Sequence, residues 1–257
     1  MNKPLSVLIT GASSGIGAQL AADYVAKGYQ VFACGRSAER LQNLTGVTPV
    51  VFDIDDREQV YQAGRNVASL ISAPLDIIIL NAGVCEYIDD ARQFDDELFA
   101  RVIHTNLIAT GYCLAAFLPL VAKGGHLALM SSSATFLGLP RAEAYGASKA
   151  GLSYLAASLA VDLAEHDISV SCISPGFVAT PLTDKNNFAM PMRISAAQAA
   201  RVIMSGIEKK QYAINFPRRF IAVMKLLAWL PKRWWHKLIR LQPKANSGSG
   251  TSKGLKK

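Results

Sequence analysis

The chain has 257 residues, of which 51% are hydrophobic and 18% charged, and this composition excludes a wholly disordered protein. Its formal net charge is +8, but residues 217–257 hold 11 Lys and Arg side chains and no acids. The preceding residues contain 16 basic and 19 acidic side chains and are therefore slightly acidic. The body of the chain gives no reason to expect a nucleic-acid partner.

The cysteines and histidines show no paired spacing that would suggest a disulfide framework or a metal site. They are Cys34, Cys85, Cys113, Cys172, His104, His126, His166 and His236. We interpret the cysteines as reduced thiols and predict no metal site. The first ten residues contain no apolar stretch long enough for a signal peptide, so we expect a cytoplasmic protein.

Apolar runs of strand length alternate with segments of helical periodicity along residues 1–216. The predicted strands are 5–10, 30–34, 50–53, 76–80, 126–130, 168–174 and 212–216. The predicted helices are 16–27, 39–44, 58–71, 95–121, 144–165 and 196–209. This alternation predicts an α/β fold with one doubly wound parallel sheet of about seven strands and helices on both faces, that is, a Rossmann-like dinucleotide-binding and catalytic domain.

A glycine-rich turn, T-G-A-S-S-G-I-G at residues 10–17, joins the first predicted strand to the first helix. Its glycines allow the backbone to approach a pyrophosphate, and the helix N-terminus offers free N–H groups to an anion. A purely structural tight turn is the alternative. Because the turn follows a strand and opens a helix, we predict cofactor binding. The predicted contacts are Gly11, Ser13, Ser14, Gly15, Ile16 and Gly17.

The stretch A-Y-G-A-S-K places Tyr145 and Lys149 four residues apart in a predicted helix. Positions i and i+4 share a helix face, so the ammonium group can lie beside the phenol. A nearby cation lowers the pKa of a tyrosine, which would make Tyr145 a usable proton donor and acceptor. The alternative is a solvated surface pair without a role.

Further motifs follow in order along the chain. They are Asn81-Ala82-Gly83 after the fourth strand, Asn106 in H-T-N-L, Ser132, Tyr145-x-x-x-Lys149, and Pro175-Gly176 followed by Thr180. Together with the T-G-x-x-x-G-x-G turn, this set resembles the short-chain dehydrogenase/reductase superfamily over roughly residues 5–215. The resemblance implies an NAD(P)-dependent oxidoreductase that interconverts a carbonyl and a secondary alcohol.

The resemblance also implies a role for each catalytic residue. Ser132 would donate a hydrogen bond to the substrate oxygen, and Tyr145 would act as the general acid. Lys149 would hold the nicotinamide ribose, and Asn106 would hold a water molecule that links Lys149 to solvent. Ser132 lies in S-S-S, where its neighbours could serve only to cap backbone groups, and the family interval selects Ser132.

The remaining cofactor contacts that the resemblance implies are Asn81, Ala82, Gly83, Tyr145, Lys149, Pro175, Gly176 and Thr180. After the second strand, Gly35 occupies the position of the acid that NAD-selective folds use, and Arg36 follows it. We therefore predict NADP(H) in preference to NAD(H), with Arg36 on the 2′-phosphate. A solvated arginine is the alternative. Asp53 would contact the adenine, or it would belong to a helix-start cluster.

The substrate loops suggest an apolar pocket. The predicted lining segments are 84–89, 134–142 and 177–193, and the last contains Phe188, Met190, Pro191 and Met192. We predict an apolar or lipid-like small-molecule carbonyl. The alternative is a cofactor-binding scaffold or sensor without turnover. The acyl-carrier-protein ketoreductases of this superfamily usually finish with a short glycine-rich strand that builds a tetramer interface, whereas this chain continues with apolar and basic residues, so we do not expect the usual tetramer. We expect a homodimer.

The C-terminal extension, residues 217–244, reads as a basic amphipathic helical segment followed by a flexible tail at 245–257. Within 218–241 the polar stripe is Arg218, Lys225, Lys232, His236 and Arg240, and the opposite surface carries apolar side chains up to Leu241. Pro231 should kink or divide the helix. We predict peripheral attachment to an anionic membrane at its cytoplasmic face. Packing over the pocket or at a dimer contact is the alternative.

Overall fold

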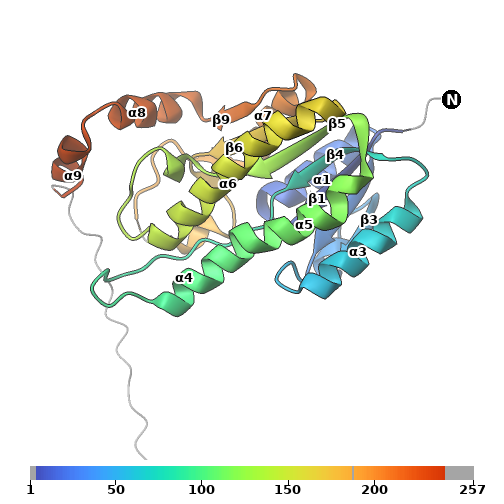
Figure 1. The fold of residues 1–257 in the computed structure, drawn as a ribbon, viewed down its shortest axis with the longest axis horizontal. Helices are drawn as coiled ribbons and strands as arrows, with labels where there is room; N and C mark the ends of the chain where they lie inside the picture. Colours follow the sequence, from blue (N-terminus) through green and yellow to red (C-terminus); the bar gives the residue numbers. More distant parts are fainter. Residues whose placement is uncertain (1–3, 187, 241–257) are drawn as a thin grey trace, which may run out of the picture.

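The computed structural model describes residues 4–186 and 188–240, and its centre is a seven-stranded parallel sheet (Figure 1). The strands are β1 Ser6–Thr10, β2 Gln30–Gly35, β3 Val47–Val51, β4 Leu75–Leu80, β5 Val121–Met130, β6 Ser169–Pro175 and β9 Ala213–Phe216. They lie in the order β3-β2-β1-β4-β5-β6-β9. The order reverses between β1 and β4, which is the point where doubly wound sheets bind ligands. The predicted fold class and its seven strands are confirmed.

Helices cover both faces of this sheet. They are α1 Gly15–Ala26, α2 Ala38–Gln42, α3 Arg57–Leu70, α4 Asp96–Ile103, α5 Ala109–Phe117, α6 Glu143–Asp162 and α7 Ala196–Glu208, followed by α8 Arg218–Ala228 and α9 Lys232–Arg240. In β1, Val7 and Ile9 join the core under α1 and α7, whereas Leu8 joins the core under α3, α5 and α6. Alternate residues of a buried strand thus serve two cores, which explains its continuous apolar sequence.

The prediction of a helical segment at 95–121 is confirmed to within a residue at each end, because the run Asp96–Leu120 is helical and β5 begins at Val121. Within this run, between α4 and α5, the chain forms a π-helical turn, His104–Ile108, which was not predicted. Asp55, before α3, accepts a hydrogen bond from Thr105 Oγ1 at 3.0 Å and ties this turn to the neighbouring loop. Such turns often lie at functional sites, and this one carries the buried Asn106.

By length and composition alone, the helical run Asp96–Leu120 could cross a membrane. In the fold, however, α5 packs against α3 and β4 and buries Cys113 and Phe117. The apolar character of this run is explained by its place over the sheet.

Two short strands, β7 Val178–Ala179 and β8 Ile194–Ser195, close the loop between β6 and α7. They were not predicted, because two residues carry no recognisable period. Ser195 then caps α7 in a capping box with Gln198. Residue 187 of this predicted substrate loop lies outside the described residues.

The extension forms two helices, α8 and α9, with Pro231 between them. Of the two effects predicted for Pro231, a kink or a division of the helix, the structure shows the division. Figure 1 shows the pair at the same end of the molecule as the loop between β5 and α6. The predicted surface residue Leu241 and the rest of 241–257 lie outside the described residues.

Candidate active site

The glycine turn between β1 and α1 has the shape of an anion cradle. Gly11 and Gly15 have φ values of +66° and +58°, which glycine adopts without strain. A Cβ atom on Gly17 would lie 2.3 Å from the carbonyl oxygen of Gly11. Ser14 is exposed at the N-cap of α1, and its side chain makes no capping hydrogen bond. The turn therefore fits a pyrophosphate at the first turn of α1.

The turn after β4 is fastened to this glycine turn. Asn81 Nδ2 donates to the carbonyl oxygens of Thr10 at 3.0 Å and Gly11 at 3.3 Å. Thr10 Oγ1 accepts hydrogen bonds from the backbone N–H groups of Asn81 and Ala82. Ile16, a predicted cofactor contact, packs partly against the core instead of lying wholly in the turn. The glycine turn and the turn after β4, about 70 residues apart in sequence, are thus joined by hydrogen bonds at one edge of the sheet.

The segment after β6 lies against the same edge. A Cβ on Gly15 would lie 3.2 Å from Thr180 Cβ, so Thr180 borders the glycine turn. Gly176 follows Pro175 at the end of β6, and a Cβ there would lie 2.7 Å from the ring of Phe220. The structure thus brings these predicted residues to the cofactor edge and places α8 directly beside them.

The two residues predicted to read the adenosine half of the cofactor form an ion pair. Arg36 Nη1 lies 3.6 Å from Asp53 Oδ2 just beyond the ends of β2 and β3. The space beside Gly35 is open, since even a Cβ atom on this residue would lie 3.4 Å from Ser13 Oγ, which is an ordinary contact distance. Asp56 caps α3 by accepting a hydrogen bond from a backbone N–H. Asp53 belongs to the same helix start, since its Oδ1 accepts a hydrogen bond from the N–H of Asp55 at 3.1 Å, so both interpretations of Asp53 remain open.

Ser132 and Tyr145 meet at the end of β5. Ser132 precedes a 3₁₀ turn, and its Oγ accepts a hydrogen bond from the N–H of Ala134 at 3.1 Å. Tyr145 lies in the first turn of α6, and the nearby Ser132 hydroxyl acts to lower the pKa of its phenol. Ser131 instead donates to the carbonyl oxygen of Lys149 at 3.0 Å and is structural. Of these two neighbouring serines, Ser132 is therefore the one that influences the phenol.

Lys149 is buried, and its Nζ donates to the carbonyl oxygen of Met130 at 2.8 Å. Burial lowers the pKa of Lys149 to about 8. Its Nζ lies 5.9 Å from the centroid of the Tyr145 ring. Desolvation nevertheless raises the pKa of Tyr145, Cys85 adds to this rise, and Ser132 opposes it. The net direction is therefore opposite to the predicted lowering, and a lowering of this pKa by Lys149 stays a prediction.

Asn106 fixes the loop after β4 onto α6. Its Oδ1 accepts from the N–H of Val84 at 2.8 Å, and its Nδ2 donates to the Val84 carbonyl and to Ser148 Oγ, both at 2.9 Å. A Cβ on Gly83 would lie 2.8 Å from Asn106 Oδ1 and 3.2 Å from Lys149 Nζ. Since these bonds occupy the side chain, Asn106 positions the surroundings of Lys149. The predicted water-holding role stays a prediction.

A chain of aromatic rings forms one wall beside these groups. Ring centroids are 5.4 Å apart for Tyr87 and Phe188, 6.1 Å for Phe188 and Phe177, and 5.5 Å for Phe177 and Phe220. The Tyr87 hydroxyl lies near the thiol of Cys85, which in turn lies close to Tyr145. Sequence reasoning did not connect these rings, because they come from separate segments that only the fold pairs.

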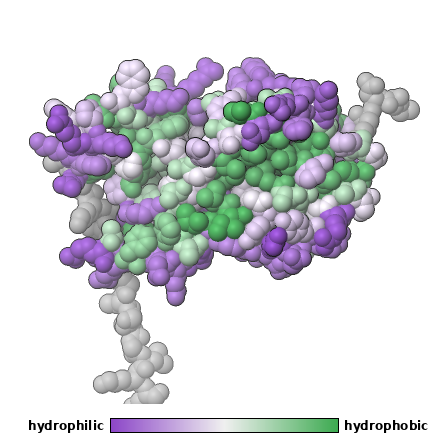
Figure 2. All heavy atoms as spheres, in the orientation of Figure 1, coloured by the Kyte–Doolittle hydropathy of each residue, from purple (hydrophilic) through white to green (hydrophobic). Residues whose placement is uncertain are grey.

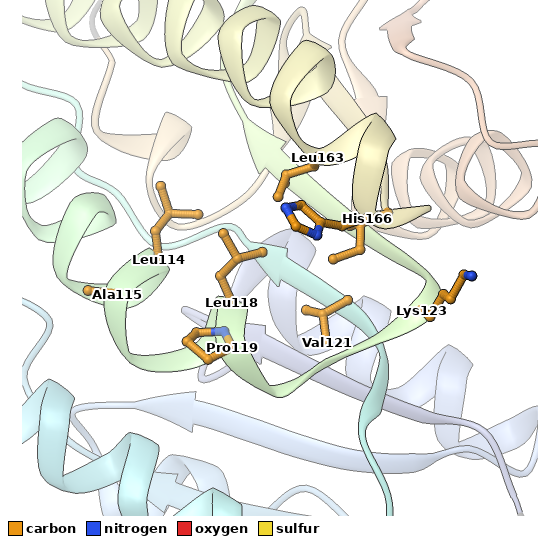
Figure 3. A pocket seen from close by; sticks show the side chains of 9 residues that line it. Leu114, Ala115, Leu118, Pro119, Val121, Lys123, Leu163 and His166 are labelled. Atoms are coloured by element: carbon orange, nitrogen blue, oxygen red, sulfur yellow. The ribbon is translucent and has the colours of Figure 1, made fainter.

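The hollow drawn in Figure 3 lies elsewhere. Its volume is about 560 Å³, and its lining includes Leu118, Val121 and Leu163. Val121 begins β5, whereas Ser132 follows the other end of that strand, so the hollow lies at the opposite end of the sheet. Within residues 4–186 and 188–240, no three His, Cys, Asp or Glu side chains group closely enough to hold a metal ion.

Comparison with known proteins agrees with this geometry. Residues 6–190 match the family model for short chain dehydrogenase. An uncharacterized oxidoreductase of Myxococcus xanthus is 36% identical over 236 residues, which cover 88% of this chain and 92% of the relative. A putative ketoacyl reductase of granaticin polyketide synthase from Streptomyces violaceoruber is 34% identical over 194 residues, covering 71% of each chain.

The fold is also that of a crystallised short chain dehydrogenase from Burkholderia cenocepacia in complex with NADP. The TM-score is 0.81 at 24% identity, and the match covers 94% of this chain and 99% of the other. From the family match and its relatives, the chain belongs to the short-chain dehydrogenase/reductase superfamily of NAD(P)-dependent oxidoreductases.

Proposed function

We propose that the protein is an NADPH-dependent oxidoreductase that interconverts a carbonyl and a secondary alcohol. The observation that carries this proposal is the buried Lys149 ammonium group, whose Nζ lies 5.9 Å from the centroid of the Tyr145 ring, with Ser132 at the end of the adjacent strand β5. A serine hydroxyl and a tyrosine acid at one point suit an oxygen that gains negative charge and then a proton.

Each of these side chains has a proposed task in the reducing direction. When bound, the nicotinamide cofactor would supply a hydride for the carbonyl carbon. Ser132 donates a hydrogen bond to the carbonyl oxygen, and the Tyr145 phenol transfers its proton to that oxygen as the alcohol forms. Lys149 holds the nicotinamide ribose hydroxyls and stabilises the phenolate that remains. Asn106 holds the loop that contains Gly83 against Lys149, and in this way it fixes the position of the Lys149 ammonium group.

The residues along the carboxyl ends of the strands would hold the cofactor. The glycine turn would take the pyrophosphate, Arg36 the 2′-phosphate and Asp53 the adenine. The other contacts would be Asn81, Ala82, Gly83, Pro175, Gly176 and Thr180. The missing acid at Gly35 supports NADP(H) over NAD(H), as does the similarity to the Burkholderia cenocepacia protein crystallised with NADP.

The substrate we propose is an apolar, lipid-like carbonyl, because aromatic rings line the wall next to Cys85 and Tyr145. The alternative is a cofactor-binding scaffold or sensor without turnover. A panel of short, aromatic and long-chain ketones, read by NADPH absorbance, separates the two. Turnover of long-chain members supports the proposal, and NADPH binding without any turnover supports the alternative.

We propose that two copies associate through the face of α5 and α6. Figure 2 shows hydrophobic side chains spread across this side of the molecule, and Ile108, Tyr154 and Val161 are exposed. The protein should then run as a homodimer in light scattering. A Tyr154→Glu and Val161→Glu double variant should be monomeric, and a parent protein that is already monomeric would contradict this arrangement.

We further propose that residues 1–216 act as the catalytic body and that 217–244 form an attachment segment ahead of a tail at 245–257. The body would work in the cytoplasm, and 218–241 would attach it to the cytoplasmic face of an anionic membrane. Support comes from the basic composition of this segment and from the apolar side chains that α8 and α9 expose.

A further inference from the structure

The helical pair α8–α9 has an inner face that is committed to the protein. Ile221, Met224 and Trp235 are buried, with Trp235 only 7% exposed. Trp235 Nε1 donates to the carbonyl oxygen of Gly138 at 2.8 Å, which fixes α9 to the loop between β5 and α6. Membrane attachment and intramolecular packing were alternatives for this segment when only its sequence was considered. The structure divides its apolar side chains between an inner and an outer set.

The outer face of α8–α9 remains exposed and apolar. Leu226 is 71% exposed and Trp229 is 89% exposed, and four other large apolar side chains are exposed with them. These are Val223, Leu230, Trp234 and Leu238. Six exposed large apolar residues within a span of sixteen residues are far from the scattered single residues expected on a protein surface.

The same helices carry a uniform positive charge. Their exposed cations are Arg218, Arg219, Lys225, Lys232, Arg233, Lys237 and Arg240. None of the seven forms an ion pair with another described residue, and residues 218–240 contain no acid. Cations beside leucines and tryptophans suit the boundary between lipid head groups and acyl chains, whereas a nucleic acid would leave the leucines in water. An anionic bilayer is therefore the partner whose chemistry this face fits best.

The inner face contacts both walls of the candidate active site. On one side, Phe220 of α8 packs on Phe177 and leaves no space for a side chain at Gly176. On the other side, Trp235 holds Gly138, which lies six residues after Ser132. Figure 1 shows α8 and α9 along this rim of the molecule. A bilayer bound to the outer face would therefore lie next to the entrance of the site.

We propose that α8–α9 is a two-faced docking element: its outer face binds an anionic bilayer, and its inner face forms the rim through which a carbonyl dissolved in that bilayer enters. This inference deepens, and rests on, the proposed reductase function. Leu226 and Trp229 are the central docking residues, because they are the two most exposed apolar side chains of the pair.

Sedimentation of the full-length protein with vesicles tests the docking. The probes are phosphatidylglycerol/phosphatidylcholine vesicles and pure phosphatidylcholine vesicles, at low salt. We expect the protein to sediment with the anionic vesicles, and a Leu226→Ser and Trp229→Ser double variant to lose roughly tenfold in affinity. The matched control is Leu70→Ser and Val202→Ser, which removes two exposed apolar side chains from α3 and α7 and should bind like the parent. A parent protein that stays in the supernatant overturns the inference.

Turnover with two probes tests substrate delivery. For hexadecan-2-one in the anionic vesicles, the docking variant should show an apparent KM raised roughly tenfold, whereas its kcat/KM for water-soluble butan-2-one should stay within about twofold of the parent. Equal loss with both ketones overturns delivery from the bilayer. If the parent reduces neither ketone while still sedimenting with vesicles, the reductase proposal and the delivery step are wrong, and only the docking of the outer face is supported.

Discussion

Arg36 Nη1 lies 3.6 Å from Asp53 Oδ2, so the cation expected to hold the 2′-phosphate is paired with the acid expected to contact the adenine. The two side chains are 68% and 37% exposed. An ion pair this open contributes less than about 1 kcal/mol to stability. The pair therefore holds Arg36 near the cofactor edge without competing strongly against a phosphate dianion.

The first prediction concerns the choice of cofactor. NADPH should bind at least about tenfold more tightly than NADH, and Arg36→Ala should weaken NADPH selectively. Arg40→Ala, which changes an exposed cation on the neighbouring α2, is the control and should leave the ratio unchanged. Fluorescence titration of both cofactors measures the ratio, and equal affinities in the parent protein would contradict the assignment.

The glycine turn offers a second test with a matched pair of variants. Gly17→Ala places a methyl group 2.3 Å from the Gly11 carbonyl oxygen, so the cradle must deform and NADPH should bind at least roughly tenfold more weakly. Gly111→Ala in α5 meets no atom within 4 Å and should bind NADPH normally, with a gain in stability of about 0.5–1 kcal/mol. Calorimetric titration measures the affinity for NADPH, and thermal unfolding measures the stability of each variant. Normal binding by Gly17→Ala would show that the turn does not hold the cofactor.

Lys149 should make the stability of the cofactor-free protein depend on pH. Because its pKa is about 8 in the folded state and higher when unfolded, the folded protein loses this proton first. The contribution of Lys149 to the free energy of unfolding is therefore lowest at neutral pH, and it rises as the pH increases from about 8 to about 10.5. At neutral pH, Lys149→Met should raise the free energy of unfolding by up to about 3 kcal/mol and raise the Tm with it. This difference in stability between variant and parent should shrink at alkaline pH.

Thermal unfolding of parent and variant at a series of pH values measures this difference. A variant that is less stable than the parent at neutral pH would show that the hydrogen bond to Met130 outweighs the cost of burying the charge.

Trp235, which lies in α9, should hold the predicted substrate loop that contains Gly138. Trp235→Phe keeps a ring but removes the hydrogen bond to Gly138, at a cost of about 1 kcal/mol in unfolding free energy. Because the loop is loosened, the KM for an apolar carbonyl should rise several-fold with a smaller effect on kcat. Trp234→Phe, which changes an exposed ring of the same helix, should leave both unchanged. Equal effects of the two variants would show that the hydrogen bond has no special role.

Much of the site was predictable, because the fold places motif residues at fixed points. Strand ends in a parallel sheet lie at one edge, so Gly11, Asn81, Ser132 and Gly176 had to converge once the strands were recognised. Their mutual bonds confirm this convergence at the glycine turn, where Asn81 contacts Gly11.

Other features depend on contacts that no local pattern encodes. The π-helical turn at Asn106 is held by Asp55, some 50 residues earlier, so helical periodicity could not reveal it. Trp234 and Trp235 are adjacent and chemically identical, yet one is exposed and the other is buried on Gly138. The direction of the pKa shift of Tyr145 also differs from the prediction, because desolvation and Cys85, which sequence does not place beside the phenol, raise this pKa.

The central claim is that the Tyr145 phenol transfers the proton, and the most direct measurement is single-turnover NADPH oxidation by Tyr145→Phe with a carbonyl that the parent protein reduces. The variant keeps the ring but has no proton to give, so the rate should fall at least roughly a hundredfold while NADPH binding stays within about twofold. A rate close to that of the parent, with NADPH bound, would show that another group supplies the proton and would contradict this account.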